Sequence, residues 1–231
     1  MNVNGFYDTI FKRKSIRKYD LSPLDDNSLS DIIMFIKDLN PLYPDIETEI
    51  NIVLPNDIKG LIQVKAPYYI VAFSEVKEGY LTNIGFMLQQ MDLFFSSNGI
   101  GSCWQGWPKP TKELRNNLNL EFVIVLAFGL PKEKLYRESI HEFKRKSLKQ
   151  ITDIEGFDEL IEPARLSPSP SQPWFFTGER KTIHVCCVKT TGIKAKIKSI
   201  DKLNRIEIGI AICHLWIAAF HFNKKIDFFC N

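Results

Sequence analysis

The sequence predicts an α+β fold in which a central mixed, mainly antiparallel sheet is flanked by helices and two pseudo-symmetric halves form one compact unit. The first observation behind this prediction is an internal repeat: segment 143–149 (FKRKSLK) matches segment 11–17 (FKRKSIR) almost letter for letter. The second observation is that the same order of predicted elements follows each copy: a helix, a proline break, a strand, a long apolar helix and a further strand. We therefore place the halves at residues 1–142 and 143–231, arranged like an isologous dimer within one chain.

The first half contains the clearer elements. Phe6, Tyr7, Ile10 and Phe11 recur at helical spacing and predict a helix over residues 6–13. Apolar periodicity, apolar runs and helix-stop signals predict the other elements: a helix over 26–39 ended by 40–44 (NPLYP), strands over 50–54 and 68–73, a helix over 83–98 closed by 99–101 (GIG), a polar-aromatic loop over 102–108, a strand over 122–128, and a charged, exposed connection over 132–142.

The second half repeats this order in fewer residues. Its predicted elements are a helix over 157–165, a proline-rich segment over 167–174, a strand over 182–189, a long apolar helix over 205–222 and a last strand over 226–229. Segment 83–86 (NIGF) aligns with segment 207–210 (EIGI). Because both long helices are apolar around most of their circumference, we expect them to pack together as the core pair.

Composition is that of an ordinary globular chain: 231 residues, 45% hydrophobic and 25% charged, with a net charge of +3. The charge is too small to indicate a nucleic-acid partner. We expect neither a signal peptide nor a membrane helix, and we interpret the apolar run 208–220 as a buried helix. Five scattered cysteines without CxxC spacing argue against a disulfide framework and a zinc site, and favour the cytoplasm.

Segment 12–18 (KRKSIRK) concentrates cations around Ser15, at the point where a predicted helix ends. Guanidinium, hydroxyl and backbone N–H donors in such a position can hold a phosphate. A charge run alone is more often a solvated surface. The second copy of the motif favours the phosphate-binding interpretation.

Four segments, in order, resemble motifs of the FMN-dependent nitroreductase family. Segment 13–17 (RKSIR) looks like the family's Arg-Arg-Ser-x-Arg motif, and 167–174 (SPSPSQPW) is similar to its Ala-Pro-Ser-x-x-Asn-x-Gln-Pro-Trp motif. Segment 99–106 (GIGSCWQG) looks like the glycine-rich segment beside the isoalloxazine ring, and 126–131 (LAFGLP) resembles the strand and Gly-x-Pro that follow. The resemblance implies a flavin-binding set of Arg13, Lys14, Ser15, Arg17, Gln105, Gly106, Ser167, Pro168, Ser169 and Gln172, with Trp104 toward substrate.

The resemblance also implies an activity. FMN carries electrons from NADH or NADPH to a nitroaromatic, a quinone or a similar small acceptor, and neither a catalytic side chain nor a metal is needed. Family members are homodimers with flavin at the interface. Here the intact basic motif lies in the first half and the Ser-Gln-Pro-Trp segment in the second, so the chain is similar to a fused branch with one intact site. The reciprocal pair, 146–149 (KSLK) with 40–44 (NPLYP), looks degenerate.

One departure favours a rival class of function. Aligned on Gln172, the family's Asn falls at Pro170, which has no side-chain amide. The alternative is therefore a non-enzymatic flavin- or nucleotide-binding protein, or a degenerate relative. Trp104 and Trp107 fit loop anchors as well as substrate contacts, and His214 in an apolar helix reads as a satisfied core histidine. Arg145 and its neighbour Lys144 could reach the first-half site or merely mark the repeat.

Overall fold

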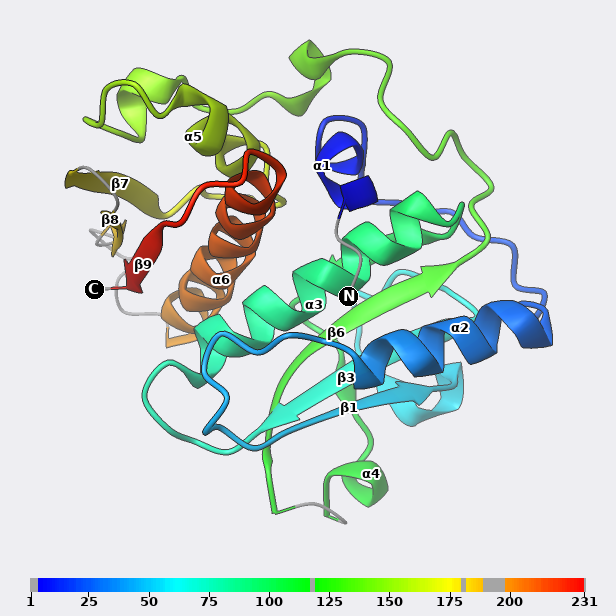
Figure 1. Ribbon diagram of the computed structural model, residues 1–231. Helices are drawn as coiled ribbons and strands as arrows, with labels where there is room; N and C mark the ends of the chain where they lie inside the picture. Colours follow the sequence, from blue (N-terminus) through cyan, green and yellow to red (C-terminus); the bar gives the residue numbers. More distant parts are fainter. Residues whose placement is uncertain (1–3, 117–118, 180–181, 189–197, 231) are drawn as a thin grey trace.

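The computed structural model describes residues 4–116, 119–179, 182–188 and 198–230 (Figure 1). Its α-helices are α1 (Asn4–Ile10), α2 (Asp26–Lys37), α3 (Tyr80–Ser97), α4 (Lys112–Asn116), α5 (Asp158–Arg165) and α6 (Lys198–His221). Its strands are β1 (Thr48–Val53), β2 (Ile58–Lys59), β3 (Tyr68–Ser74), β4 (Gly101–Gln105), β5 (Lys109–Pro110), β6 (Glu121–Gly129), β7 (Trp174–Glu179), β8 (Thr182–Cys187) and β9 (Asp227–Cys230). The helices and strands predicted from apolar patterns are present, and Lys189, predicted to end a strand, lies outside the described residues.

The larger sheet is fully antiparallel, in the order β1-β3-β6-β4. Every residue of β3 is buried, because α2 and α3 cover one face of this sheet and a layer of loops covers the other. β4 occupies the stretch expected to be a loop. It forms a strand because residues 101–105 pair with residues 125–129 of β6, and that tertiary pairing overrides a local sequence without strand periodicity.

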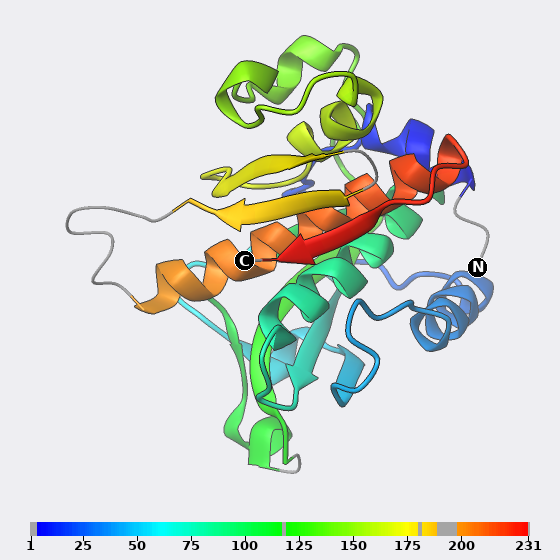
Figure 2. The same cartoon turned by 60° about the vertical axis from the view of Figure 1, so that its left-hand side comes forward.

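A second sheet joins β7 to β8 antiparallel and β8 to β9 in parallel. The chain therefore has two main sheets where one central sheet was expected. Figure 2 shows α3 and α6 lying between them, with the three-stranded sheet beside α6 and the four-stranded sheet beside α3. Two long helices that are apolar around most of their circumference need cover on both sides, and one sheet on each side supplies it. The two sheets differ in the number and direction of their strands. That the two halves of the chain superpose therefore stays a prediction.

The pair α3 and α6 forms the centre of the protein, as expected. A Cβ added to Gly85 would lie 2.1 Å from the Ile206 carbonyl oxygen, and a Cβ added to Gly209 would lie 2.0 Å from the Thr82 carbonyl oxygen. The two contacts are reciprocal, since 82 and 85 align with 206 and 209. Glycine at both positions therefore allows a backbone approach that any side chain would prevent.

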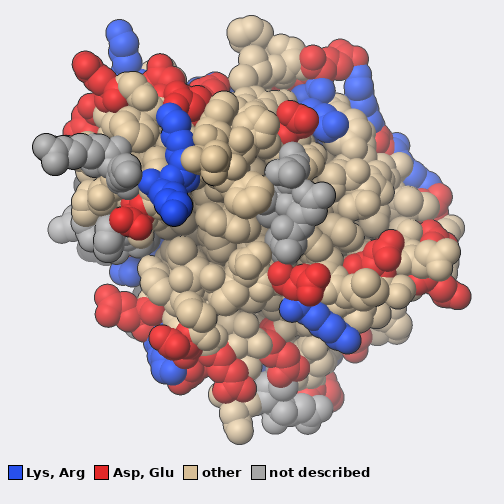
Figure 3. Space-filling model, in the orientation of Figure 1, with Lys and Arg blue, Asp and Glu red and all other residues tan. Residues whose placement is uncertain are grey.

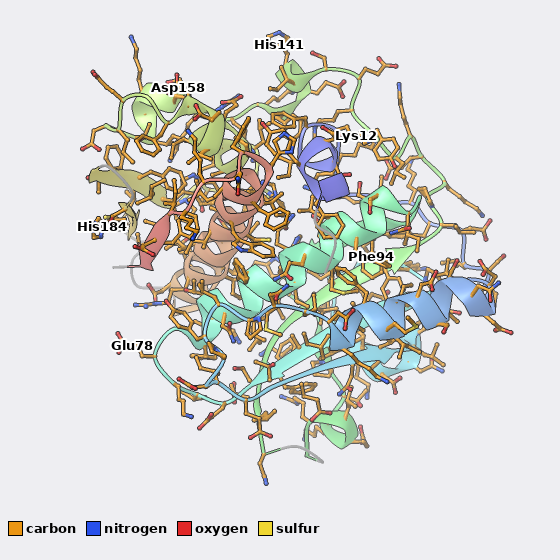
Figure 4. The ribbon with its side chains drawn as sticks, viewed as in Figure 1. Lys12, Glu78, Phe94, His141, Asp158 and His184 are labelled. Atoms are coloured by element: carbon orange, nitrogen blue, oxygen red, sulfur yellow. The ribbon has the colours of Figure 1, made fainter. Side chains whose placement is uncertain are left out.

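Outer elements pack on this centre. Phe94 on α3 points toward α2 and stacks on Phe35, with ring centroids 4.1 Å apart (Figure 4). Helix α6 includes a segment, Ser199–His221, that is long and apolar enough to cross a membrane, yet 78% of its apolar window is buried inside the protein. It is the buried helix expected from residues 208–220. On the face shown in Figure 3, the described basic side chains are separated by acidic and uncharged ones.

Candidate functional site

A cavity of about 600 Å³ opens where the first basic motif, the end of β4, the connection after β6, the proline-rich segment and the first turns of α6 meet. Its charged and polar lining comes from Arg13, Lys14, Ser15, Arg17, Glu133, Arg137, Arg145, Ser169 and Glu207. Its other lining residues are Cys103, Trp104, Gly106, Trp107, Ile124, Phe143, Pro168, Pro170, Leu203, Ile206 and Ile210. Both halves of one chain thus contribute to a single cavity.

Arg13 is the most deeply placed cation of the first motif, with 2% of its surface exposed. Its Nε lies 3.1 Å from Oδ2 of the buried Asp92 in an ion pair that lacks hydrogen-bond alignment. Asp92 also accepts a hydrogen bond from Ser102 Oγ at 2.5 Å. Arg13 Nη2 donates to Ser15 Oγ at 3.3 Å, so the guanidinium is fixed between α3 and the cavity.

Two further arginines converge on Arg13. Arg137 donates from Nη1 to the Arg13 carbonyl oxygen, and Arg145 donates from Nη1 to the Ser169 carbonyl oxygen at 2.6 Å. Burial, followed by repulsion from Arg13, lowers the pKa of Arg137 to about 10 and that of Arg145 to about 10. Among the described residues, the buried Nε of Arg145 has no hydrogen-bond partner. The cluster therefore has spare donors and excess positive charge directed at an anion.

The opposite wall is held by Glu207 on α6. Its carboxylate accepts hydrogen bonds from Ser169 Oγ and, at 3.0 Å, from Ser171 Oγ, and burial raises its pKa. The aligned residue on α3, Asn83, does the same for the loop at 40–44, accepting from Leu42 N at 2.8 Å and from Tyr43 N at 3.0 Å. Each long helix thus anchors one proline-containing loop through the same position.

A buried polar chain connects Asp92, the ion-pair partner of Arg13, to helix α5. Gln89 Nε2 lies 3.0 Å from Asp92 Oδ2 and 3.0 Å from His214 Nε2, and His214 Nδ1 lies 2.7 Å from the Pro163 carbonyl oxygen. Because that carbonyl only accepts, His214 carries its proton on Nδ1 and accepts from Gln89 at Nε2. Burial lowers the His214 pKa to about 3, so the ring is neutral. His214 is the satisfied core histidine that the sequence suggested, although it connects Arg13 to α5.

The cavity brings together most of the residues expected to bind flavin or substrate: Arg13, Lys14, Ser15, Arg17, Trp104, Gly106, Pro168 and Ser169. The other three lie beside it, with their side chains engaged elsewhere. Gln105 accepts from Val64 N at 3.0 Å, Ser167 donates to the Ala164 carbonyl oxygen at 2.7 Å, and Gln172 accepts from Lys146 N at 2.8 Å. Pro170 lines the cavity with its ring.

The sequence did not identify Arg137, Glu133 and Glu207 as cavity residues. It left two interpretations of Arg145, as a residue that reaches the first-half site or as a mark of the repeat. The repeat drew attention to Arg145, but only the fold turns its side chain into the first-half site. Nothing local distinguishes Arg137 within the charged connection that contains it. Cys103, also in the lining, has a pKa raised by burial, which favours an inert thiol over a reactive thiolate.

Solved structures share this fold. A crystal structure described as a "putative nitroreductase" from Thermotoga maritima is 18% identical, with a TM-score of 0.67 over 97% of this chain and 87% of that one. A nitroreductase family protein from Clostridium difficile is 18% identical, with a TM-score of 0.52 over 67% of this chain and 99% of that one. No curated protein matches the sequence. By fold, this chain is therefore a nitroreductase-like α+β protein.

Residues 5–219 match the family described as "Putative TM nitroreductase". The chain belongs to this nitroreductase family, and membership indicates an oxidoreductase.

Proposed function

We propose that this protein is an FMN-dependent oxidoreductase that takes electrons from NADH or NADPH and passes them to a nitroaromatic, a quinone or a similar small acceptor. The observation that carries the proposal is the convergence of Arg13, Arg137 and Arg145 on one cavity. Asp92 pairs with Arg13, yet burial and repulsion from Arg13 still lower the pKa of both Arg137 and Arg145, so a further anion among the three guanidiniums would be stabilised. A phosphate monoester, with its three oxygens and high charge, fits this donor set.

The rest of the cavity suits a flavin. Trp104, Ile124, Leu203 and Ile210 offer an apolar wall for a flat ring, while Ser15 and Arg17 supply polar groups near the basic cluster. When bound, FMN accepts a hydride and returns electrons to a second substrate. The chain's own part is to hold the phosphate with arginines, to orient the ring against the apolar wall, and to place cations where negative charge develops.

Two observations support the proposal that one intact site lies within a fused pseudo-dimer. The reciprocal glycine contacts of α3 and α6, and the matched loop anchors Asn83 and Glu207, relate the two helices as a two-fold axis does. A relative that is covered over 99% of its length occupies only 67% of this chain. We extend the proposal to a cytoplasmic location, which suits the free thiols of Cys103 and Cys213.

The test is the absorption spectrum of the purified protein with and without added FMN, followed by anaerobic addition of NADH or NADPH. We expect a yellow protein that is bleached by at least one reductant and recolours when an acceptor is added. A protein that binds FMN but is not bleached fits the non-enzymatic alternative, which Pro170 in place of an amide favours. A protein that does not take up FMN contradicts the proposal altogether.

A further inference from the structure

A second cavity, of about 680 Å³, adjoins the first and shares Gly106, Ile124 and Leu203 with it. Its apolar floor is formed by Leu120, Phe122, Val123, Ile124 and Leu203. Four cations line it: Lys109, Lys112, Arg115 and Lys202, against one carboxylate, Glu121. The expected flavin cavity and this basic, partly apolar chamber therefore lie side by side along a shared wall.

The charges of this chamber are largely uncompensated. Among the described residues, Lys109, Lys112 and Arg115 have no carboxylate within ion-pair distance, and all three are exposed to solvent. Lys202 is fixed at the wall, since its Nζ donates to the Phe122 carbonyl oxygen at 2.8 Å and lies 5.3 Å from the Phe122 ring centroid. Burial lowers the Lys202 pKa; the nearby Glu121 carboxylate opposes this shift, and Lys109 adds to it. An anionic ligand would therefore compensate the exposed cations that Glu121 leaves unpaired.

We propose that this chamber binds the phosphate-bearing adenosine end of NADPH, so that NADPH is the preferred reductant over NADH. The inference rests on the proposed function. Because the two cavities share Gly106, Ile124 and Leu203, a dinucleotide with its nicotinamide end in the first cavity can place its adenosine end in the second. Adenine can pack on the apolar floor beside Phe122, and the 2′-phosphate supplies the dianion that three free cations attract.

The kinetic test compares kcat/KM for NADPH and NADH in the parent and in the double variant Lys112→Ala/Arg115→Ala. Exposed cations acting together on one phosphate give about a tenfold preference that salt weakens. We expect the NADPH:NADH ratio to fall about tenfold in the double variant, with FMN affinity unchanged. Lys37→Ala/Lys149→Ala removes two exposed cations away from both cavities and is expected to leave the ratio unchanged. An unaltered ratio in the double variant overturns the inference, as does a parent that prefers NADH.

A binding measurement separates this inference from the proposed function. Adenosine 2′,5′-bisphosphate is titrated calorimetrically into the FMN-loaded protein and into flavin-free protein. We expect binding that the Lys112→Ala/Arg115→Ala variant loses and the control variant keeps. If the protein takes up no FMN, the proposed function fails, yet this titration still decides whether the chamber binds the phosphorylated nucleotide. Binding that is insensitive to the double variant, no binding, or an effect confined to the KM of an anionic acceptor overturns the inference.

Discussion

Replacing Arg145 by alanine separates binding of the flavin phosphate from stability of the fold. Within the part of the chain that the structure describes, Arg145 makes one hydrogen bond, to the Ser169 carbonyl oxygen, and its Nε is unpaired. Its pKa of about 10 records a penalty for holding its charge in the flavin-free protein at neutral pH. Removing the side chain relieves that penalty and loses the single hydrogen bond. We therefore expect the unfolding free energy of the flavin-free protein to fall by less than about 1 kcal/mol, or to rise.

The affinity for FMN responds differently. Losing one cation of a buried charge pair costs about 2–5 kcal/mol. Because Arg145 is partly exposed and shares the anion with Arg13 and Arg137, the lower end of that range, about 2–3 kcal/mol, applies. At about 1.4 kcal/mol per decade, FMN should bind about 30- to 150-fold more weakly. Fluorescence quenching on titration with FMN measures this affinity, and chemical denaturation measures stability.

Lys149→Ala is the matched control. Lys149 is exposed and belongs to the same second motif, so its removal should change neither quantity. Arg13→Ala is a poorer probe, since it leaves Asp92 buried without its cation and should destabilise the fold by about 3–5 kcal/mol. If Arg145→Ala binds FMN within threefold of the parent, or Lys149→Ala loses as much affinity, the arginine cluster is not the phosphate site.

Two other predictions concern the core. The pKa of His214 is lowered to about 3 in the folded protein, whereas in the unfolded chain the ring takes up a proton below about pH 6.5. The contribution of His214 to the free energy of unfolding is therefore present above pH 6.5 and is lost as the pH falls, by about 2 kcal/mol between pH 7.5 and 5. Denaturation of the parent should show that extra loss relative to His214→Gln, and parallel pH profiles would contradict a neutral buried ring. Gly209→Ala should lower the free energy of unfolding by about 3 kcal/mol or more, because the added Cβ would lie 2.0 Å from the Thr82 carbonyl oxygen. Gly5→Ala, whose Cβ would meet nothing within 4 Å, should be neutral or stabilising. Thermal denaturation compares the two variants, and equal effects would refute the close crossing of α3 and α6.

The sequence predicted best those elements in which most consecutive residues are apolar. The apolar run of β3 and the mostly apolar circumference of α3 and α6 predict interior elements, so the type of each follows from its residues. β4 has no such pattern, and its conformation depends on pairing with β6. The order of layers was also beyond the sequence, because periodicity shows that a helix is covered but not by which sheet.

Some residues of the candidate site could likewise be predicted from the sequence, and others could not. The repeat and the nitroreductase-like motifs pointed to Arg13, Ser15 and the Pro168–Ser169 segment, which the fold brings to one cavity. Arg137 carries no local signal, because its position depends on a backbone contact with Arg13 across more than a hundred residues. Gln172, in a recognisable motif position, instead ties its loop to Lys146. A motif marks a segment, whereas tertiary packing decides which side chain of that segment faces the ligand.

Both walls of the cavity belong to one polypeptide, and the closely crossed helices α3 and α6 carry them: Asp92 holds Arg13 on one side and Glu207 holds Ser169 on the other. In an assembly of separate subunits, dilution can part such walls by mass action. Here the effective concentration of one wall for the other is set by the chain and does not change with the amount of protein. The cavity should therefore keep its ligand at the low abundance at which a two-chain site comes apart.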